Sequence, residues 1–127
     1  PALTVFGFDY PTYDGTCVRD YVHVSDIADA HVLALKHLNH GGSTCCLNLG
    51  TGEGSSVTEI INSVEEVTGS QVNVIAGQRR MGDPPVLVAD PSRAMQMLGW
   101  TPKYPHIKIQ IEHAWHWFIK RSTDGDL

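Results

Sequence analysis

Apolar and polar residues change their spacing along the chain in a way that separates helices from strands. In four segments the apolar residues recur three and four positions apart, as in helices with one buried face. Between them lie short segments of alternating or uninterrupted apolar residues, which are typical of strands. We expect helices between Ser25 and Gly41, between Ser56 and Gly69, between Pro91 and Gly99, and over residues 107–120. We expect strands over residues 3–7, 44–49 and 72–75, a strand or extended segment over 18–24, and a brief extended piece over 86–89.

Three local signals refine these assignments. Ser25 is a candidate N-cap of the first helix, and Ser56 with Glu59 has the spacing of a capping box. The apolar run 44–49 is typical of a buried strand in a parallel sheet. The alternation of strands and helices predicts an α/β fold with a short mixed sheet and about four helices. Because the strands are few and short, we expect the edge of a sheet and a small α/β lobe, a piece of something larger.

The composition is that of one globular domain and excludes some functions. The chain has 127 residues, of which 42% are hydrophobic and 18% charged, and its net charge is −5. A surface for nucleic acid needs clustered Lys and Arg, so we expect none. A phosphorylated small molecule stays possible, because two well-placed arginines suffice to bind a diphosphate. No apolar run is long enough to span a membrane, and no signal-peptide pattern is present, so we expect no membrane association.

The cysteines suggest a cellular compartment, and the first residue suggests how the chain was produced. Cys17, Cys45 and Cys46 are odd in number and lack the spacing of a zinc site. We interpret them as reduced core thiols of a cytoplasmic protein. The chain begins at Pro1 without an initiator Met, which suggests a fragment, processing or trimming.

Four motifs carry a resemblance to a known family. The Asp-Tyr-Pro-Thr stretch at 9–12 and the Val-Arg-Asp-Tyr stretch at 18–21 are the most specific of them. The full motifs lie at residues 5–16, 18–24, 48–57 and 79–83. In order and spacing they resemble the C-terminal, substrate-binding part of UDP-glucose 4-epimerases, in the extended short-chain dehydrogenase/reductase superfamily. The resemblance covers nearly the whole chain, and it implies a UDP-sugar-binding domain over 1–121 and a flexible tail over 122–127.

The resemblance assigns roles to residues on both sides of the proposed ligand. Arg19 and Arg80 match the arginines that hold the UDP diphosphate, as guanidinium forks from separate loops can do. Asp83 matches a carboxylate that accepts hydrogen bonds from the ribose. Thr4 and Phe6 match positions that flank the uracil.

Two further positions concern the nucleotide and the sugar. Val57 matches an apolar contact to the nucleotide. Leu87 matches a position that lines the sugar pocket and influences whether an N-acetyl group fits. Relatives carry a bulky Tyr or a small Cys there, so Leu87 leaves the choice of sugar open. Because the family's pocket also uses residues upstream of Pro1, we expect weak or no UDP-sugar binding by the isolated chain.

The activity implied by the resemblance is that of an isomerase in galactose metabolism. Such enzymes interconvert UDP-glucose and UDP-galactose through a 4-keto intermediate formed with bound NAD. This needs a Rossmann half and a Tyr-x-x-x-Lys pair with a nearby Ser or Thr, which we expect to be absent here. The spacing Tyr104 to Lys108 matches nominally, but it straddles a proline and a helix start. We therefore expect no catalytic residue and no NAD bound by this chain alone.

Other patterns have simpler structural interpretations. Gly50, Gly52 and Gly54 do not have the spacing of a dinucleotide-binding loop, and we interpret them as a tight strand-to-helix turn. His113 and His116 lie three residues apart on a helix without a third ligand at metal-site spacing, so we expect no metal.

Three hypotheses remain open from the sequence. The chain is the UDP-sugar-binding part of an epimerase, silent unless joined to an NAD-binding Rossmann half, with that half or a second copy in a homodimer as possible partners. It is a part of another nucleotide-sugar enzyme, such as a dehydratase or a UDP-pentose or UDP-uronate epimerase. It is a non-catalytic binding module that keeps the same fold. A free-standing module would shield the run 44–49 and be a monomer, whereas an orphaned half would expose it and self-associate.

Overall fold

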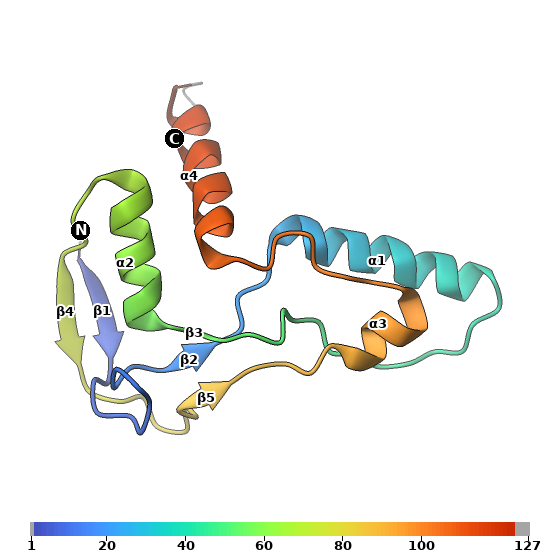
Figure 1. Ribbon diagram of the computed structural model, residues 1–127, viewed down its shortest axis with the longest axis horizontal. Coiled ribbons are helices and arrows are strands. Elements are labelled where there is room, and N and C mark those ends of the chain that lie inside the picture. Colours follow the sequence, from blue (N-terminus) through green and yellow to red (C-terminus); the bar gives the residue numbers. More distant parts are fainter. Residues whose placement is uncertain (1, 124–127) are drawn as a thin grey trace.

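The structure is a computed structural model that describes residues 2–123, and these residues form four helices and five short strands (Figure 1). The helices are α1 (Val24–Asn39), α2 (Val57–Thr68), α3 (Ser92–Leu98) and α4 (Ile107–Thr123). The strands are β1 (Leu3–Phe6), β2 (Val18–Arg19), β3 (Ser55–Ser56), β4 (Val74–Gly77) and β5 (Val86–Leu87). The predicted α/β class is therefore confirmed.

The strands form two separate small sheets. In one, β1 and β4 run parallel, with Leu3 opposite Val74 and Phe6 opposite Gly77. In the other, β2 lies between antiparallel β3 and parallel β5. Helices α2 and α4 pack together near the first sheet, and α1 packs with α3 at the other end of the molecule (Figure 1). The second sheet lies between these two groups and holds the order β3-β2-β5.

Helix α1 begins earlier than predicted, because its N-cap is His23 and not Ser25. The Nδ1 atom of His23 accepts a hydrogen bond from the Ser25 amide at 3.0 Å, which satisfies one of the free donors of the first turn. The predicted strand 18–24 is correspondingly short, and only Val18 and Arg19 pair in a sheet.

Helix α2 has the capping box that the sequence predicts. The Ser56 hydroxyl accepts from the Glu59 amide at 3.0 Å, and Glu59 Oε2 accepts from the Ser56 amide at 2.9 Å. The helix ends at Gly69, which has a φ of 68° in the left-handed region that favours glycine. Local residue chemistry thus fixes both ends of α2.

The best-buried cluster lies where α1, α3 and the segment after α3 meet. Trp100 is 1% exposed and packs with Ala30 and Ala94. Its indole nitrogen donates to the Asp26 carbonyl at 2.9 Å. The Asp26 carboxylate, also 1% exposed, accepts from the amides of Lys103 and Tyr104 at 3.0 Å each. A buried carboxylate with two amide donors ties α1 to the segment that leads into α4.

The prediction of a buried strand over 44–49 is wrong for the described part of the chain. The segment belongs to no strand, and its backbone makes no hydrogen bond within residues 2–123. Cys45, Leu47 and Leu49 are half-buried, whereas Thr44, Cys46 and Asn48 are exposed. The alternation of a strand is present, but no neighbouring strand among the described residues pairs with it. The interpretation of the cysteines as core thiols holds for buried Cys17 but is wrong for exposed Cys46.

The last helix is longer than predicted. Helix α4 continues to Thr123, so Ser122 and Thr123 of the predicted tail are helical. The remaining residues of that tail, 124–127, lie outside the described residues. Along α4, Ile107, Ile111 and Trp115 are half-buried at four-residue intervals.

Candidate functional site

Two predicted arginines and one predicted aspartate lie together although they come from different parts of the sequence. Arg80 Nε donates to Asp83 Oδ2 at 2.9 Å. Arg19 Nη2 lies 4.0 Å from the other carboxylate oxygen of Asp83. Arg19 Nη1 also donates to the carbonyls of Val18 and Pro84, at 2.8 and 2.9 Å. The fold therefore brings Arg19 and Arg80 together at the carboxylate of Asp83.

Phe6 and Leu87 flank this group, and Thr4 lies near Phe6 on the same strand. The guanidinium carbon of Arg80 is 5.1 Å from the centroid of the Phe6 ring. Leu87 is opposite Arg19 in the parallel register of β2 and β5, and it is 59% exposed. Thr4 lies in β1, exposed and opposite Ile75 of β4. Four of the predicted site residues, Phe6, Arg19, Arg80 and Asp83, are thus linked by contacts.

Val57 lies at the opposite edge of the three-stranded sheet from Leu87. It directly follows β3, and β3 and β5 flank β2 on either side. Its amide donates to the Cys17 carbonyl at 3.1 Å, which fixes the start of α2 against β2. The residue is half-buried. The structure therefore places Val57 beside β2 but records no contact between it and the group around Asp83.

A second ion pair, which the sequence interpretation left out of the site, lies beside this group. Arg79 Nε donates to Asp9 Oδ1 at 2.7 Å, and the guanidinium carbon lies 4.4 Å from the Tyr10 ring centroid. The hydrogen bond from Arg79 holds the pKa of Asp9 below its usual value. Asp9 in turn raises the pKa of Arg79. The sequence signal was the pair of adjacent arginines, of which only Arg80 was assigned a role.

The local charge favours an anion. Three guanidinium groups, of Arg19, Arg79 and Arg80, face two carboxylates, of Asp9 and Asp83. The side chain of Arg80 is 63% exposed, and that of Arg19 is 23% exposed. Accessible donors with a net positive charge suit a diphosphate, which accepts from guanidinium groups in a bidentate geometry.

The glycine-containing turn 50–54 does not fit the phosphates of NAD. Its amides at Thr51 and Gly52 donate to the Asp20 carboxylate, at 2.8 and 3.1 Å. The Thr51 hydroxyl and the Ala89 amide donate to the same carboxylate, at 2.8 and 3.3 Å. A cradle for an anion needs free amides, and here an aspartate of the chain already occupies them. Through Asp20, the turn therefore connects the end of β2 to the segment after β5.

Tyr104 and Lys108 have separate partners. Lys108 Nζ forms an ion pair with Glu66 of α2, which raises the pKa of Lys108 through the hydrogen bond with that carboxylate. The Tyr104 ring packs against His23 and His113, with centroid distances of 4.6 and 5.0 Å. In the part of the chain that the structure covers, no three His, Cys, Asp or Glu side chains gather as metal ligands would.

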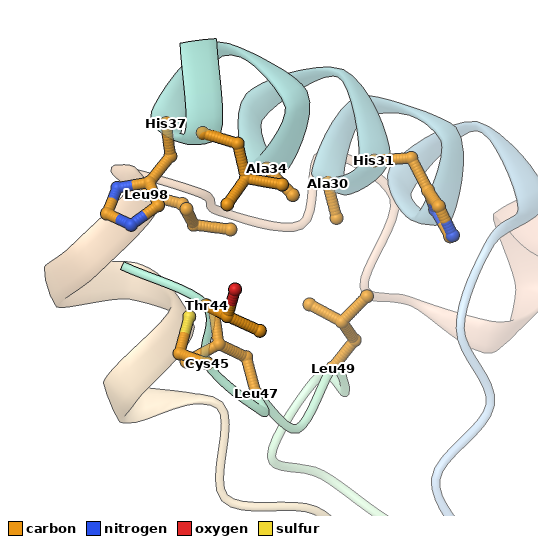
Figure 2. Close-up of a pocket in the computed structure, with 10 residues that line it drawn as sticks. Ala30, His31, Ala34, His37, Thr44, Cys45, Leu47, Leu49 and Leu98 are labelled. Atoms are coloured by element: carbon orange, nitrogen blue, oxygen red, sulfur yellow. The ribbon is translucent and has the colours of Figure 1, made fainter. Parts of the chain in front are cut away.

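An apolar cavity of about 230 Å³ lies between α1 and the extended segment 44–49 (Figure 2). Ala30 and Ala34 face it from the helix, and Leu47 and Leu49 face it from the segment. No Asp, Glu, Lys or Arg side chain lines the cavity, so its lining does not include Arg19, Arg79 or Arg80. Among residues 2–123 no helix combines the length and hydrophobicity needed to cross a bilayer.

Comparisons with known proteins agree on one group of enzymes. The model of the NAD dependent epimerase/dehydratase family matches residues 2–50. The UDP-glucose 4-epimerase of Azospirillum brasilense is 51% identical over 117 residues, which is 92% of this chain and 34% of that enzyme. The chain thus spans about a third of the length of the curated relatives it matches.

Solved structures give the same result. A crystal structure of a UDP-glucose 4-epimerase matches with a TM-score of 0.90 and 48% identity, over 95% of this chain and 37% of that one. The enzyme from Stenotrophomonas maltophila, solved with NAD and formylated UDP-arabinopyranose, matches with a TM-score of 0.90 and 45% identity. That match covers 98% of this chain and 37% of the other.

Proposed function

The chain resembles UDP-glucose 4-epimerases over about a third of their length, and we propose that it is the UDP-sugar-binding part of such an epimerase. In this proposal residues 1–121 form the binding domain, and the sugar nucleotide lies across the ends of β1, β2 and β5. The reaction of the whole enzyme interconverts UDP-glucose and UDP-galactose. Arg19 and Arg80 hold the diphosphate, and Asp83 accepts from the ribose.

The observation that carries the proposal is the convergence of Arg19 and Arg80 on Asp83. Sixty residues of sequence separate the two arginines, yet both side chains reach one carboxylate. Two guanidinium groups on different loops can bind two phosphates at once, which fixes the orientation of the ligand. Phe6 and Thr4 border the site where the base would lie, and Leu87 borders it where the sugar would lie.

The hydride chemistry belongs to another part of the enzyme. NAD, held by residues outside this chain, would supply the hydride-transfer chemistry of the whole enzyme. The turn 50–54 does not fit the phosphates of that cofactor, because the amides of Thr51 and Gly52 are bonded to Asp20. We propose that this chain binds and orients the UDP-sugar, while an NAD-binding partner half supplies the chemistry. The three free cysteines support a cytoplasmic location for the protein.

Calorimetric titration with UDP, and then with UDP-glucose, tests the proposal. Saturable UDP binding that Arg80→Ala weakens would support it, even if the affinity is only millimolar. Arg93, an exposed arginine of α3, offers a matched control because Arg93→Ala removes the same charge at a helix position outside the proposed site. Equal binding by the parent and Arg80→Ala would overturn the diphosphate assignment. Absence of any UDP binding at millimolar ligand would mean that binding needs the NAD-binding half or that the function of the chain lies elsewhere.

A further inference from the structure

We propose that Arg79 is a positioning residue that Asp9 and Tyr10 hold in place so that Arg80 faces the ligand. This inference rests on the proposed function only in naming the ligand as a UDP-sugar. The arrangement of Arg79 itself is a property of the free protein. It concerns a residue that makes no contact with Asp83 and that would not touch the diphosphate directly.

Three contacts fix the Arg79 side chain. Its Nε donates to Asp9 Oδ1 at 2.7 Å, and its Nη2 donates to the Asp9 carbonyl. The guanidinium group also lies over the buried Tyr10 ring, 4.4 Å from the centroid. A planar guanidinium bonded to Asp9 through two nitrogens of one edge and stacked on one face has little freedom left. Arg79 is therefore held to the turn that follows β1.

The chain comes close enough at this point to require glycine at position 7. A Cβ atom on Gly7 would lie 2.5 Å from Tyr10 Cε2 and 2.8 Å from Arg79 Cγ. Gly7 also has a φ of 92°, which side chains disfavour. Its amide donates to the Gly77 carbonyl at 3.0 Å, which continues the pairing of β1 with β4. The contact of Arg79 with Tyr10 thus forms where the two parallel strands end.

Fixing Arg79 determines the direction of Arg80. Arg79 and Arg80 share a planar peptide unit in the irregular segment after β4, so the backbone conformation that places one side chain also limits the other. Arg79 lies over Tyr10, and Arg80 lies over Phe6 with its Nε bonded to Asp83. If Arg79 were released, the backbone at 79–80 could rotate and Arg80 would leave Asp83. A ligand would then have to order Arg80 on binding, which costs conformational entropy.

The charge of Arg79 itself is already balanced. Asp9 neutralises it at 2.7 Å, so the pair adds little to the attraction of an anion. A loss of affinity on removing the pair therefore reports the position of Arg80 rather than the net charge of the site. This separates the proposal from a direct electrostatic role.

The first test needs no ligand. In nitrogen-15 NMR spectra, the Nε–H signal of Arg80 reports its hydrogen bond to Asp83. We expect Arg79→Ala and Asp9→Asn to shift this signal toward that of a free arginine, and Arg93→Ala to leave it unchanged. Arg79→Lys provides a second variant if Arg79→Ala unfolds, because lysine keeps the charge but lacks the planar fork. An Arg80 Nε–H signal that is the same in Arg79→Ala, in Asp9→Asn and in the parent would overturn the proposal.

The second test is a double-mutant cycle with UDP. We expect Arg79→Ala to weaken UDP binding by about three- to tenfold in the parent, the size of a typical coupling between neighbouring side chains. In an Arg80→Ala background the same substitution should have no further effect. Additive losses would mean that Arg79 acts on the ligand independently of Arg80, by direct contact or through charge, and would overturn the positioning role. If the parent binds no UDP, binding needs the NAD-binding half or the function lies elsewhere, while the NMR result still decides the role of Arg79.

Discussion

His23 Nε2 lies 3.1 Å from His113 Nδ1, and this hydrogen bond joins the start of α1 to α4. Because His23 Nδ1 accepts from the Ser25 amide, the proton of the neutral ring is on Nε2. His23 therefore donates to His113, and one imidazole both caps a helix and links it to another. The sequence indicated only structural histidines, without showing that these two meet.

We expect His23→Ala to destabilise the protein more than His23→Asn. The alanine variant loses the helix cap, which costs about 1 kcal/mol, and also the bond to His113. Asparagine is a good N-cap residue, so His23→Asn should lose only the link to α4. Urea unfolding of both variants measures the difference. His116→Ala, an exposed histidine on the same helix as His113, is the control and should unfold like the parent. Equal losses for the two His23 variants would show that His23 does not act as a cap.

Asp14 joins the turn after β1 to the start of α2. It accepts from the Thr16 amide and hydroxyl, at 2.9 and 2.8 Å, and from the Ser56 hydroxyl. Burial alone would raise the pKa of Asp14, but the hydrogen bonds from Ser56 and Thr16 outweigh it and hold the pKa below the usual value. The ionised carboxylate is therefore bound more favourably in the folded than in the unfolded state.

The stabilisation from Asp14 should be lost in acid. A folded-state pKa below the unfolded one stabilises the protein above the unfolded pKa of about 3.9, and this contribution falls as pH drops through the folded value. We expect Asp14→Asn to be less stable than the parent at neutral pH, and the difference to shrink below pH of about 4. Urea unfolding across this range measures it. The Glu53 side chain is exposed and has no hydrogen bonds in the described structure, so Glu53→Gln should differ from the parent by the same free energy of unfolding at every pH. A constant offset for Asp14→Asn would contradict the argument.

Local signals predicted the helices well because the residues that end a helix act within one turn. Ser56 with Glu59, and the left-handed Gly69, lie where the sequence placed them. The start of α1 was missed because a histidine rarely caps a helix, and Ser25 two residues later is the commoner choice. The run 44–49 was misjudged because burial of a strand depends on a neighbour, which no local pattern supplies.

The site could be predicted only as far as the resemblance reached. Arg19, Arg80 and Asp83 were chosen from motifs, and their contacts in the structure agree with a shared role. The ion pair of Arg79 with Asp9 spans 70 residues of sequence, and nothing in either segment indicates the other. Long-range pairs of this kind follow from the pairing of β1 with β4, which periodicity does not specify.

The two arginines at the proposed diphosphate site should each contribute to UDP affinity. We expect Arg19→Ala and Arg80→Ala to weaken binding by about 1.5–3 kcal/mol each, as for hydrogen bonds to charged groups. Arg19 also donates to the carbonyls of Val18 and Pro84, so Arg19→Lys shows whether a charge alone is enough. Calorimetry with UDP at fixed ionic strength measures each variant beside Arg93→Ala. Unchanged affinity in both alanine variants would mean that the phosphates, if bound, lie elsewhere.

The unpaired segment 44–49 should cause the isolated chain to self-associate. Its backbone has no hydrogen bond within residues 2–123, and no charged residue occurs from Gly41 to Gly52. The unpaired backbone of segment 44–49 offers donors and acceptors as an exposed strand edge does. Proteins protect such edges with lysines or prolines, and the segment has neither, so a second copy can pair with it. We expect sedimentation velocity to show association that rises with concentration and that Cys46→Lys reduces. Ser70→Lys adds the same charge at another exposed position and should leave association unchanged. A monomer at every concentration would show that this edge is not available for pairing with another copy.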